Sequence, residues 1–121
     1  MSGVARAPSV DAAPAPFPYD GPAALRQPII DALEQVVDPE VALNIVDVGL
    51  VYGVSVDATR LHVRLTMTSA ACPVVDVIID DVERELDRVA PEGLRIEVEL
   101  VWEPAWTAER MSEGAKRFMG W

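Results

Sequence analysis

The spacing of apolar residues changes several times along the chain, and each spacing predicts a different kind of element. Between positions 28 and 37 apolar residues recur at helical intervals, while acidic and amide side chains fill the other positions. Pro28 suits the first turn of a helix, because its missing N–H is not needed there. Asp38 precedes Pro39 and is therefore displaced from helical dihedral angles. We expect a short first helix that ends at Asp38.

From Val46 onward the apolar residues alternate with polar residues and glycine, which is the spacing of a strand. A second alternating run covers positions 61–68, and a tight turn at 57–60 separates the two runs. Two such runs with so short a link predict an antiparallel hairpin. Each strand has one apolar face, so we expect helices to cover the sheet on one side only.

Helical spacing returns after Cys72-Pro73 and continues to Val89, and a third alternating run covers positions 94–102. Thr107 can cap a last helix that runs towards Phe118. The expected order is α-β-β-α-β with a short C-terminal helix. This order predicts a two-layer α+β domain, with helices on one face of a small three-stranded sheet.

Residues 1–21 are dense in alanine and proline and have no period that would bury one face. We interpret them as a disordered tail, and residues 22–121 as the folded domain. A short docking peptide built on Phe17 and Tyr19 is the alternative.

Composition narrows the function classes. The net charge is −10, from twenty acidic and ten basic residues, and such a charge repels phosphate backbones, so we expect no nucleic-acid partner. No stretch approaches the ~20 apolar residues that cross a bilayer, and we expect no membrane partner. One cysteine excludes an internal disulfide. These features, and the absence of a secretory signal pattern, lead us to expect a cytoplasmic protein.

That cysteine, Cys72, stands between the second strand and the second helix. Pro73 at the first helical position would make Cys72 the N-cap, where unpaired backbone N–H groups and the helix dipole favour a thiolate. A thiolate in this place suits nucleophilic attack or metal ligation. Free cysteines also commonly pack in cores, and this alternative stays open.

Other polar residues could support that site. Thr66 and Thr68 share a face of the second strand and lead into the cysteine loop, where their hydroxyls could bond a thiolate or a sulfide; they could also be ordinary strand residues. Asp47 falls on the polar face of the first strand, as a neighbour of the site or a solvated residue. We interpret Asp38 and Glu40 first as part of the signal that ends the helix. A role as ligands is the second interpretation.

Enzymatic readings have little support. A thiol enzyme needs a base near the nucleophile, and His62, the only histidine, lies ten residues before Cys72. The chain has no phosphate-binding glycine loop, CxxC or HExxH motif. A single cysteine cannot supply four ligands to an iron–sulfur cluster, so any cluster would be shared between subunits or completed by other ligands.

Three segments together resemble one family: "DPEVALNIVDVGLVYGV", "LTMTSAACPVVDVI" and "EPAWTAERMSEGAKRFMG". They are similar to the domain of SufT-type iron–sulfur assembly factors, which PaaD and the cytosolic iron–sulfur targeting proteins share. The resemblance covers about residues 27–120. The positions that match its motifs are Asp38, Pro39, Glu40, Asp47, Gly49, Thr66, Thr68, Cys72 and Pro73. The chain departs at Pro104-Ala105-Trp106, where the family often reads PPW, and it lacks the cysteine-rich C-terminal segment of PaaD proteins.

The resemblance implies a non-enzymatic accessory role in metal–sulfur cluster biosynthesis, of the kind the SUF system performs. Cys72 would be the working residue and a possible ligand of a transient iron–sulfur cluster. The implied partners are the assembly machinery, client apoproteins and, for a shared cluster, a second copy of the chain as a homodimer. The alternative function is a metal-free adaptor between machinery and client, with Trp106 and the C-terminus as its contacts.

Overall fold

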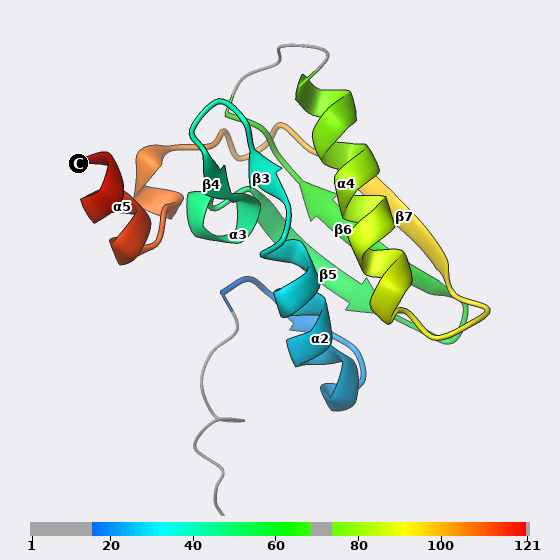
Figure 1. The fold of residues 1–121 in the computed structure, drawn as a ribbon. Coiled ribbons are helices and arrows are strands. Elements are labelled where there is room, and N and C mark those ends of the chain that lie inside the picture. Colours follow the sequence, from blue (N-terminus) through cyan, green and yellow to red (C-terminus); the bar gives the residue numbers. More distant parts are fainter. Residues whose placement is uncertain (1–15, 69–73, 121) are drawn as a thin grey trace, which may run out of the picture.

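The central sheet has four strands in the order β2-β5-β6-β7 (Figure 1). The computed structural model describes residues 16–68 and 74–120. In it, β5 (Val51–Val56) and β6 (Arg60–Leu65) form the expected antiparallel hairpin. β7 (Arg95–Leu100) pairs parallel with β6. Parallel neighbours need a crossover connection, and α4 (Val74–Val89) lies in that connection.

Two helices, α2 (Ala23–Leu33) and α4, lie on the same face of the sheet (Figure 1). The helical stripe predicted for α4 is confirmed, because the side chains of Val75, Ile78, Val82 and Leu86 are all buried. The α+β class is therefore confirmed. None of the helices in the described part of the chain is long and apolar enough to cross a membrane.

The first helix differs from its prediction at both ends. α2 begins at Ala23, so Pro28 lies inside the helix and not in its first turn. It ends at Leu33, before Asp38, which instead belongs to the short strand β3 (Val37–Asp38). β3 pairs antiparallel with β4 (Leu43–Asn44) in a separate two-stranded ribbon. Residues before Pro28 are good helix formers, so the helix extends back past the proline.

Residues 16–21 belong to the fold, although the sequence pattern assigned them to the tail. Phe17 is 5% exposed and lies in the core. β2 (Tyr19–Asp20) pairs parallel with β5, and the Val54 N–H donates to the Pro18 carbonyl at 2.9 Å. This pairing adds a fourth strand to the predicted three. A strand of two residues is too short to leave an alternating pattern in the sequence.

Residues Ile45–Val48 form a short helix, α3, and not the start of the first strand. The Asn44 side chain accepts a hydrogen bond from the Asp47 N–H at 2.9 Å and so caps the helix. Gly49 ends it with a left-handed φ of 86°. The prediction that Asp47 lies on a strand is therefore wrong, because local capping outweighs the apolar alternation.

The chain after β7 returns past β5 and α3 (Figure 1). It contains a 3-10 turn, Ala108–Arg110, and α5 (Glu113–Met119). Ser112 caps α5, and Thr107 makes no side-chain cap. The Tyr52 hydroxyl donates to the Pro104 carbonyl at 2.6 Å. The expected C-terminal helix is thus present, but it starts later and has a different cap.

Candidate functional site

The end of β6 that leads towards Cys72 holds an unusual polar group. Within residues 16–68 and 74–120, Asp38 and Thr66 are the two polar side chains that are almost fully buried, each 1% exposed. They come from different parts of the chain, Asp38 from β3 and Thr66 from the position just after β6. Thr68 connects to this group, because its hydroxyl donates to Asp38 Oδ2 at 3.5 Å. We call Asp38, Thr66 and Thr68 the β6-end cluster.

Asp38 is held by the turn that follows it. Its Oδ1 accepts the Glu40 N–H at 2.9 Å, and its backbone carbonyl accepts the Ala42 N–H at 2.8 Å. Ala42 adopts a left-handed φ of 59° at this turn. The Asp-Pro-Glu sequence therefore builds a turn in which one carboxylate oxygen fixes the backbone. The other oxygen is left for Thr68.

Thr66 is anchored by its backbone but not by its side chain. Its N–H donates to the Leu50 carbonyl at 2.8 Å. Its buried Oγ1 has no hydrogen-bond partner among the described residues. Leaving a buried hydroxyl unbonded costs about 1–3 kcal/mol, and native proteins rarely retain such groups without a reason. The Thr66 hydroxyl thus has a proton to donate and no acceptor for it in the described part of the chain, three positions before residues 69–73, which contain Cys72.

Cys72 and Pro73 lie in residues 69–73, outside the part of the chain that the structure describes. Thr68 is the last described residue before that segment, and α4 begins at Val74 directly after it. The start of the second helix next to Pro73 agrees with the sequence pattern. The N-cap role of Cys72 stays a prediction.

Asp47 takes part in a different set of contacts. Its Oδ2 accepts the Asn44 Nδ2–H at 2.9 Å, and its backbone carbonyl accepts the Ser112 N–H at 2.8 Å. These bonds join α3 to the start of α5. Asp47 therefore positions the C-terminal segment, and its hydrogen bonds do not run to the β6-end cluster.

Trp106 also holds the C-terminal segment in place. It is half-buried against the core, and its Nε1–H donates to the Val48 carbonyl at 2.8 Å. Sequence reasoning missed two residues of this junction, Tyr52 and Arg110. The Arg110 guanidinium lies 4.3 Å from the centre of the Tyr52 ring, a cation–π contact. Residues 52 and 110 are far apart in the sequence, and no local pattern links them.

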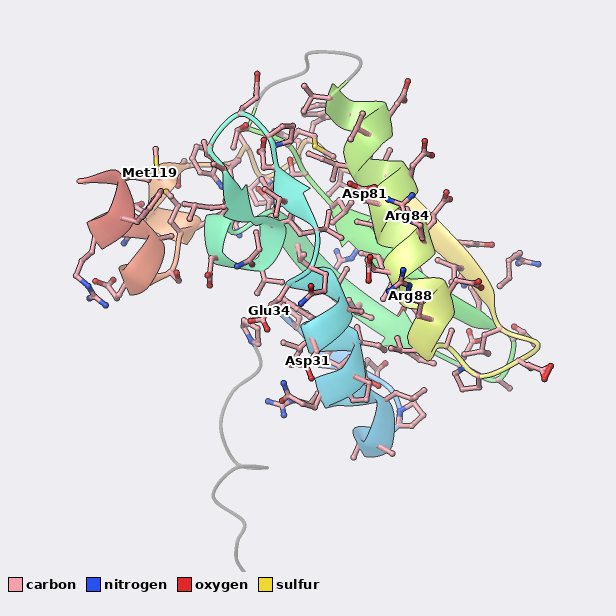
Figure 2. All side chains as sticks on the ribbon, in the orientation of Figure 1. Asp31, Glu34, Asp81, Arg84, Arg88 and Met119 are labelled. Atoms are coloured by element: carbon pink, nitrogen blue, oxygen red, sulfur yellow. The ribbon has the colours of Figure 1, made fainter. Side chains whose placement is uncertain are left out.

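Negative charge gathers near the end of α2. Burial raises the pKa of the Glu34 carboxyl, and the charges of Asp47 and Asp31 raise it further. Asp31 lies in the last turn of α2, and Glu34 is the C-cap residue that follows it (Figure 2). This group is separate from the β6-end cluster, and it gives the protein a pH-dependent contribution to stability.

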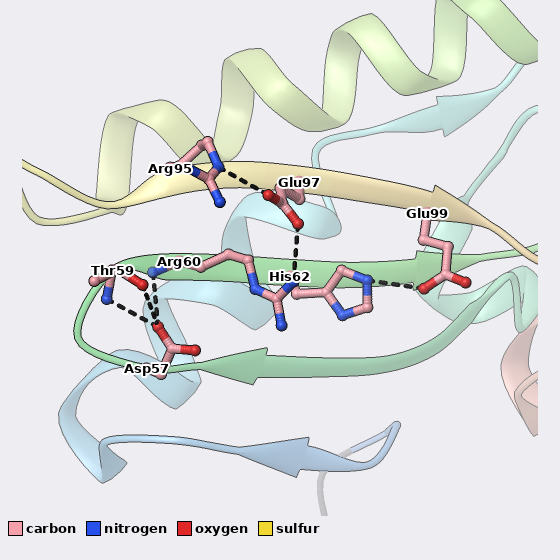
Figure 3. Close-up of polar contacts among 7 residues, drawn as sticks. All are labelled: Asp57, Thr59, Arg60, His62, Arg95, Glu97 and Glu99. Atoms are coloured by element: carbon pink, nitrogen blue, oxygen red, sulfur yellow. Dashed lines mark hydrogen bonds and ion pairs between the residues drawn. The ribbon is translucent and has the colours of Figure 1, made fainter.

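His62 lies on the open face of the sheet, in a row of ion pairs (Figure 3). Its Nε2 is 2.9 Å from Glu99 Oε1 on β7, while Arg60 and Arg95 both bind Glu97. In residues 16–68 and 74–120, no three His, Cys, Asp or Glu side chains lie close enough to hold a metal ion.

Comparison with known proteins gives one consistent result. The model of the family described as "Iron-sulfur cluster assembly protein" matches residues 26–100. The Fe-S protein maturation auxiliary factor YitW of Bacillus subtilis is 46% identical over 98 residues, which cover 80% of this chain and 95% of the relative. The auxiliary factor SufT of Staphylococcus aureus is 44% identical over 86 residues, 70% of this chain and 97% of the relative.

Solved structures agree with the sequence matches. A domain of unknown function, DUF59, from Bacillus anthracis has a TM-score of 0.73 and 42% identity, and the match covers 80% of this chain and 92% of that one. A conserved hypothetical protein from Thermotoga maritima has a TM-score of 0.67 and 34% identity, with coverage of 79% and 94%. The resemblance seen in the sequence motifs is confirmed: the chain belongs to the iron–sulfur cluster assembly protein family.

Proposed function

We propose that this chain is a non-enzymatic accessory factor that helps to assemble iron–sulfur clusters or to deliver them to client apoproteins. The cluster is its cargo, and Cys72 is the residue that contacts it. Family membership supports the accessory role, since relatives of 46% and 44% identity are named Fe-S protein maturation auxiliary factors. The partners are then the assembly machinery and the clients, and a cytoplasmic location stays a prediction.

The observation that carries the proposal for the site is the unbonded hydroxyl of Thr66. It is buried, it lacks a partner in the described part of the chain, and it comes six positions before Cys72. Hydrogen bonds to cluster sulfurs are one of the means by which proteins hold and tune iron–sulfur clusters. A thiolate or sulfide that accepted a hydrogen bond from the Thr66 hydroxyl would satisfy this donor. The hydrogen bond would stabilise a bound cluster at that position.

Asp38 would act through Thr68. The carboxylate accepts a hydrogen bond from the Thr68 hydroxyl, so the lone pairs of the Thr68 oxygen are left to accept other hydrogen bonds. The Glu40 N–H holds the carboxylate in place. Asp38 is therefore a positioning residue in this proposal, and Asp47 and Trp106 support the fold around α3 and α5.

The ligand count makes cargo binding transient. One thiol per chain cannot fill the four positions that Cys ligands usually occupy in an iron–sulfur cluster. The remaining ligands would come from a client, from a second copy of the chain or from another thiol. An incompletely ligated cluster is suited to being passed on.

A metal-free adaptor is the second candidate, and one observation favours it. Trp102 and Phe118 are 46% and 68% exposed, and both lie in the C-terminal part of the chain. Large exposed aromatic residues are typical of protein contacts. Trp106, by contrast, is bonded to Val48 and would orient this surface rather than contact the partner.

The test measures recovery of activity by an iron–sulfur apoenzyme in cells that carry the unmodified chain, Cys72→Ser or Thr66→Val. Thr107→Val is the matched control, because Thr107 is exposed and its side chain caps nothing. We expect Cys72→Ser to abolish the recovery, Thr66→Val to reduce it and Thr107→Val to leave it unchanged. Full recovery with Cys72→Ser would favour the adaptor.

A second measurement separates cluster handling from adaptor action. After anaerobic reconstitution, the visible absorption and iron content of the unmodified chain are compared with those of Cys72→Ser. We expect colour and iron that depend on Cys72. If both proteins held only background iron and both were active in cells, the adaptor would be the function.

A further inference from the structure

The outer edge of β7 is unpaired in the described part of the chain. β7 ends the sheet order, and on its other side no described element continues the sheet (Figure 1). The strand is six residues long, runs in unbroken register with β6 and contains no proline or bulge. Natural proteins usually blunt such edges with proline, bulges or charged side chains, because an open edge accepts further strands. The charged side chains of β7 are Arg95, Glu97 and Glu99, and all three are held in ion pairs with each other or with β6.

The hydrogen-bond register identifies the groups at this edge. The Arg95 N–H donates to the Thr59 carbonyl at 2.9 Å, and the Val101 N–H donates to the Leu65 carbonyl at 2.7 Å. Alternate residues of a parallel strand bond the same neighbour, so positions 95, 97, 99 and 101 face β6. The backbone N–H and C=O groups of Ile96, Val98 and Leu100 therefore point away from the sheet. They form a row of donors and acceptors for one more strand.

The surface beside this edge is acidic. An open groove between α4 and β7 is lined by Glu83, Arg84, Asp87, Leu94 and Ile96. By helical spacing, Asp76 and Asp80 continue the same side of α4. The basic residues nearby already have partners: Arg84 pairs with Asp81, and Arg60 and Arg95 pair with Glu97. Figure 2 shows Asp81 and Arg84 together on α4.

Glu83 and Asp87 form no ion pair among the described residues, so they leave uncompensated negative charge beside the apolar Ile96 side chain of β7. Ile96, Val98 and Leu100 are only half-buried against the core. Trp102, two residues past the strand, is 46% exposed. Backbone groups, apolar side chains and an aromatic residue are thus available together at one edge.

We propose that the edge of β7 binds an extended, basic segment of a partner protein, which adds to the sheet as a fifth strand. Main-chain bonds to Ile96, Val98 and Leu100 give the affinity, as in other cases of strand addition. Lysine or arginine side chains of the segment meet Glu83 and Asp87, and this gives selectivity for basic partners. The residues that carry this inference all lie outside positions 69–73, and the inference does not depend on the proposed function.

Charge argues against a second copy of this chain as the occupant. Two chains paired edge to edge would bring two α4 helices side by side, each with its acidic row. Each chain also carries a net charge of −10. Like charges that face each other are destabilising, so the edge favours a basic partner over itself.

The test uses a short fluorescent peptide that alternates lysine and valine, with an alternating glutamate–valine peptide as the charge control. Fluorescence anisotropy measures binding to the full chain. We expect saturable binding of the lysine peptide only. Val98→Pro removes an outward N–H without removing a bond to β6, and Glu83→Lys with Asp87→Lys reverses the groove charge. Each change should weaken binding about tenfold or more.

The matched control is Asp31→Lys with Glu34→Lys, which changes the net charge equally but on α2 (Figure 2). It should keep the affinity of the unmodified chain. Equal weakening in the α2 control would overturn the proposal by showing attraction to net charge alone. Absence of saturable binding would overturn it directly.

Amide signals of the unmodified chain in NMR spectra give a readout that does not depend on variants folding. On addition of the lysine peptide, we expect shifts and slower hydrogen exchange at Ile96, Val98 and Leu100. The amides of Glu97 and Glu99, already bonded to β6, should not gain protection. Protection confined to another element would refute strand addition at β7. Self-association of the chain that Val98→Pro abolishes would assign the edge to a second copy instead.

Discussion

At the residue scale, the two threonines after β6 have different roles, although the sequence treats them alike. Thr68 donates to a carboxylate that its own turn holds in place, whereas Thr66 buries a hydroxyl without a partner in the described part of the chain. When a fold retains a buried hydroxyl that destabilises it in this way, the usual reason is that the group serves the function. Stability and activity should therefore respond in opposite directions at Thr66.

We expect Thr66→Val to raise the free energy of unfolding by about 1 kcal/mol, because a methyl group replaces an unbonded buried hydroxyl. Maturation of a client enzyme should fall in the same variant. Urea unfolding measures the first effect, and Thr107→Val, at an exposed site, should stay within about 0.5 kcal/mol of the unmodified chain. A less stable Thr66→Val protein would mean that the hydroxyl is bonded before any cargo arrives.

Glu34 should make stability depend on pH. Burial and the charges of Asp47 and Asp31 raise the pKa of Glu34 in the folded state above its unfolded value. The folded state thus favours the protonated carboxyl. This contribution is fully present below the unfolded pKa of about 4.3 and is lost as pH rises through the folded pKa.

Glu34→Gln should accordingly stabilise the protein at pH 7, by about 0.5 kcal/mol or less, because the largely exposed carboxyl is only partly desolvated and solvent screens its repulsion from Asp47 and Asp31. The gain should vanish below about pH 4, where the carboxyl is protonated in both states. Thermal unfolding across this pH range measures it. Glu92→Gln, in an exposed turn, is the control, and a gain at pH 7 that persisted in acid would rule out ionisation as its cause.

At the scale of elements, length decided what the sequence could predict. α4 has 16 residues and a continuous apolar stripe, so its pattern specified both its type and its buried face. α3 has four residues, and its apolar positions fit a strand equally well until the Asn44 cap and Gly49 are taken into account. β2 has two residues and depends on pairing with β5. Such short elements are set by tertiary contacts, which no local pattern contains.

Phe17→Ala tests whether residues 16–21 belong to the fold. The ring is 5% exposed in the core, so truncation should cost about 3–5 kcal/mol. Val37→Ala, at a site 47% exposed, is the control and should change stability far less. Chemical denaturation measures both variants. Equal, small effects would mean that residues 16–21 do not contribute to the stability of the fold.

Gly49 tests how closely the C-terminal segment packs on α3. A Cβ at Gly49 would lie 2.3 Å from the Arg110 carbonyl oxygen, and the residue has φ 86°. Gly93 has a similar φ of 92° but nothing within 4 Å, so Gly93→Ala isolates the conformational cost, about 1–2 kcal/mol. We expect Gly49→Ala to lose roughly 2 kcal/mol more, the size of an overpacking effect. Urea unfolding measures both losses. Equal losses would mean that the segment around Arg110 can shift away from the added Cβ without a loss of stability.

At the scale of the whole molecule, the residues that the motifs single out fall into separate groups of contacts. Thr68 bonds Asp38, whereas Asp47 bonds Asn44 and Ser112. The meeting of β3 with the end of β6 is a tertiary contact between residues 30 apart in the sequence. No sequence motif predicted the unpaired edge of β7, because an edge depends on the order of the strands in the sheet.

The last prediction concerns how one thiol can hold a cluster. Each chain carries a single cysteine and a net charge of −10, so apo chains should repel each other and remain monomers. A cluster that recruits Cys72 from two chains would offset this repulsion with metal–thiolate bonds. We therefore expect the reconstituted protein to sediment as a dimer and to return to a monomer when a chelator removes the iron.

Two variants distinguish a dimer held by a cluster at Cys72 from a dimer paired through the edge of β7. Cys72→Ser should stay monomeric and colourless after reconstitution, while Val98→Pro should still form the cluster-dependent dimer, because the β7 edge is a separate site. Analytical sedimentation with absorption detection follows mass and cluster in one experiment. A coloured monomer would contradict a shared cluster and would require oxygen or nitrogen ligands beside Cys72. A dimer that Val98→Pro dissolves would instead place the contact at the sheet edge, where the acidic rows of α4 should keep two chains apart.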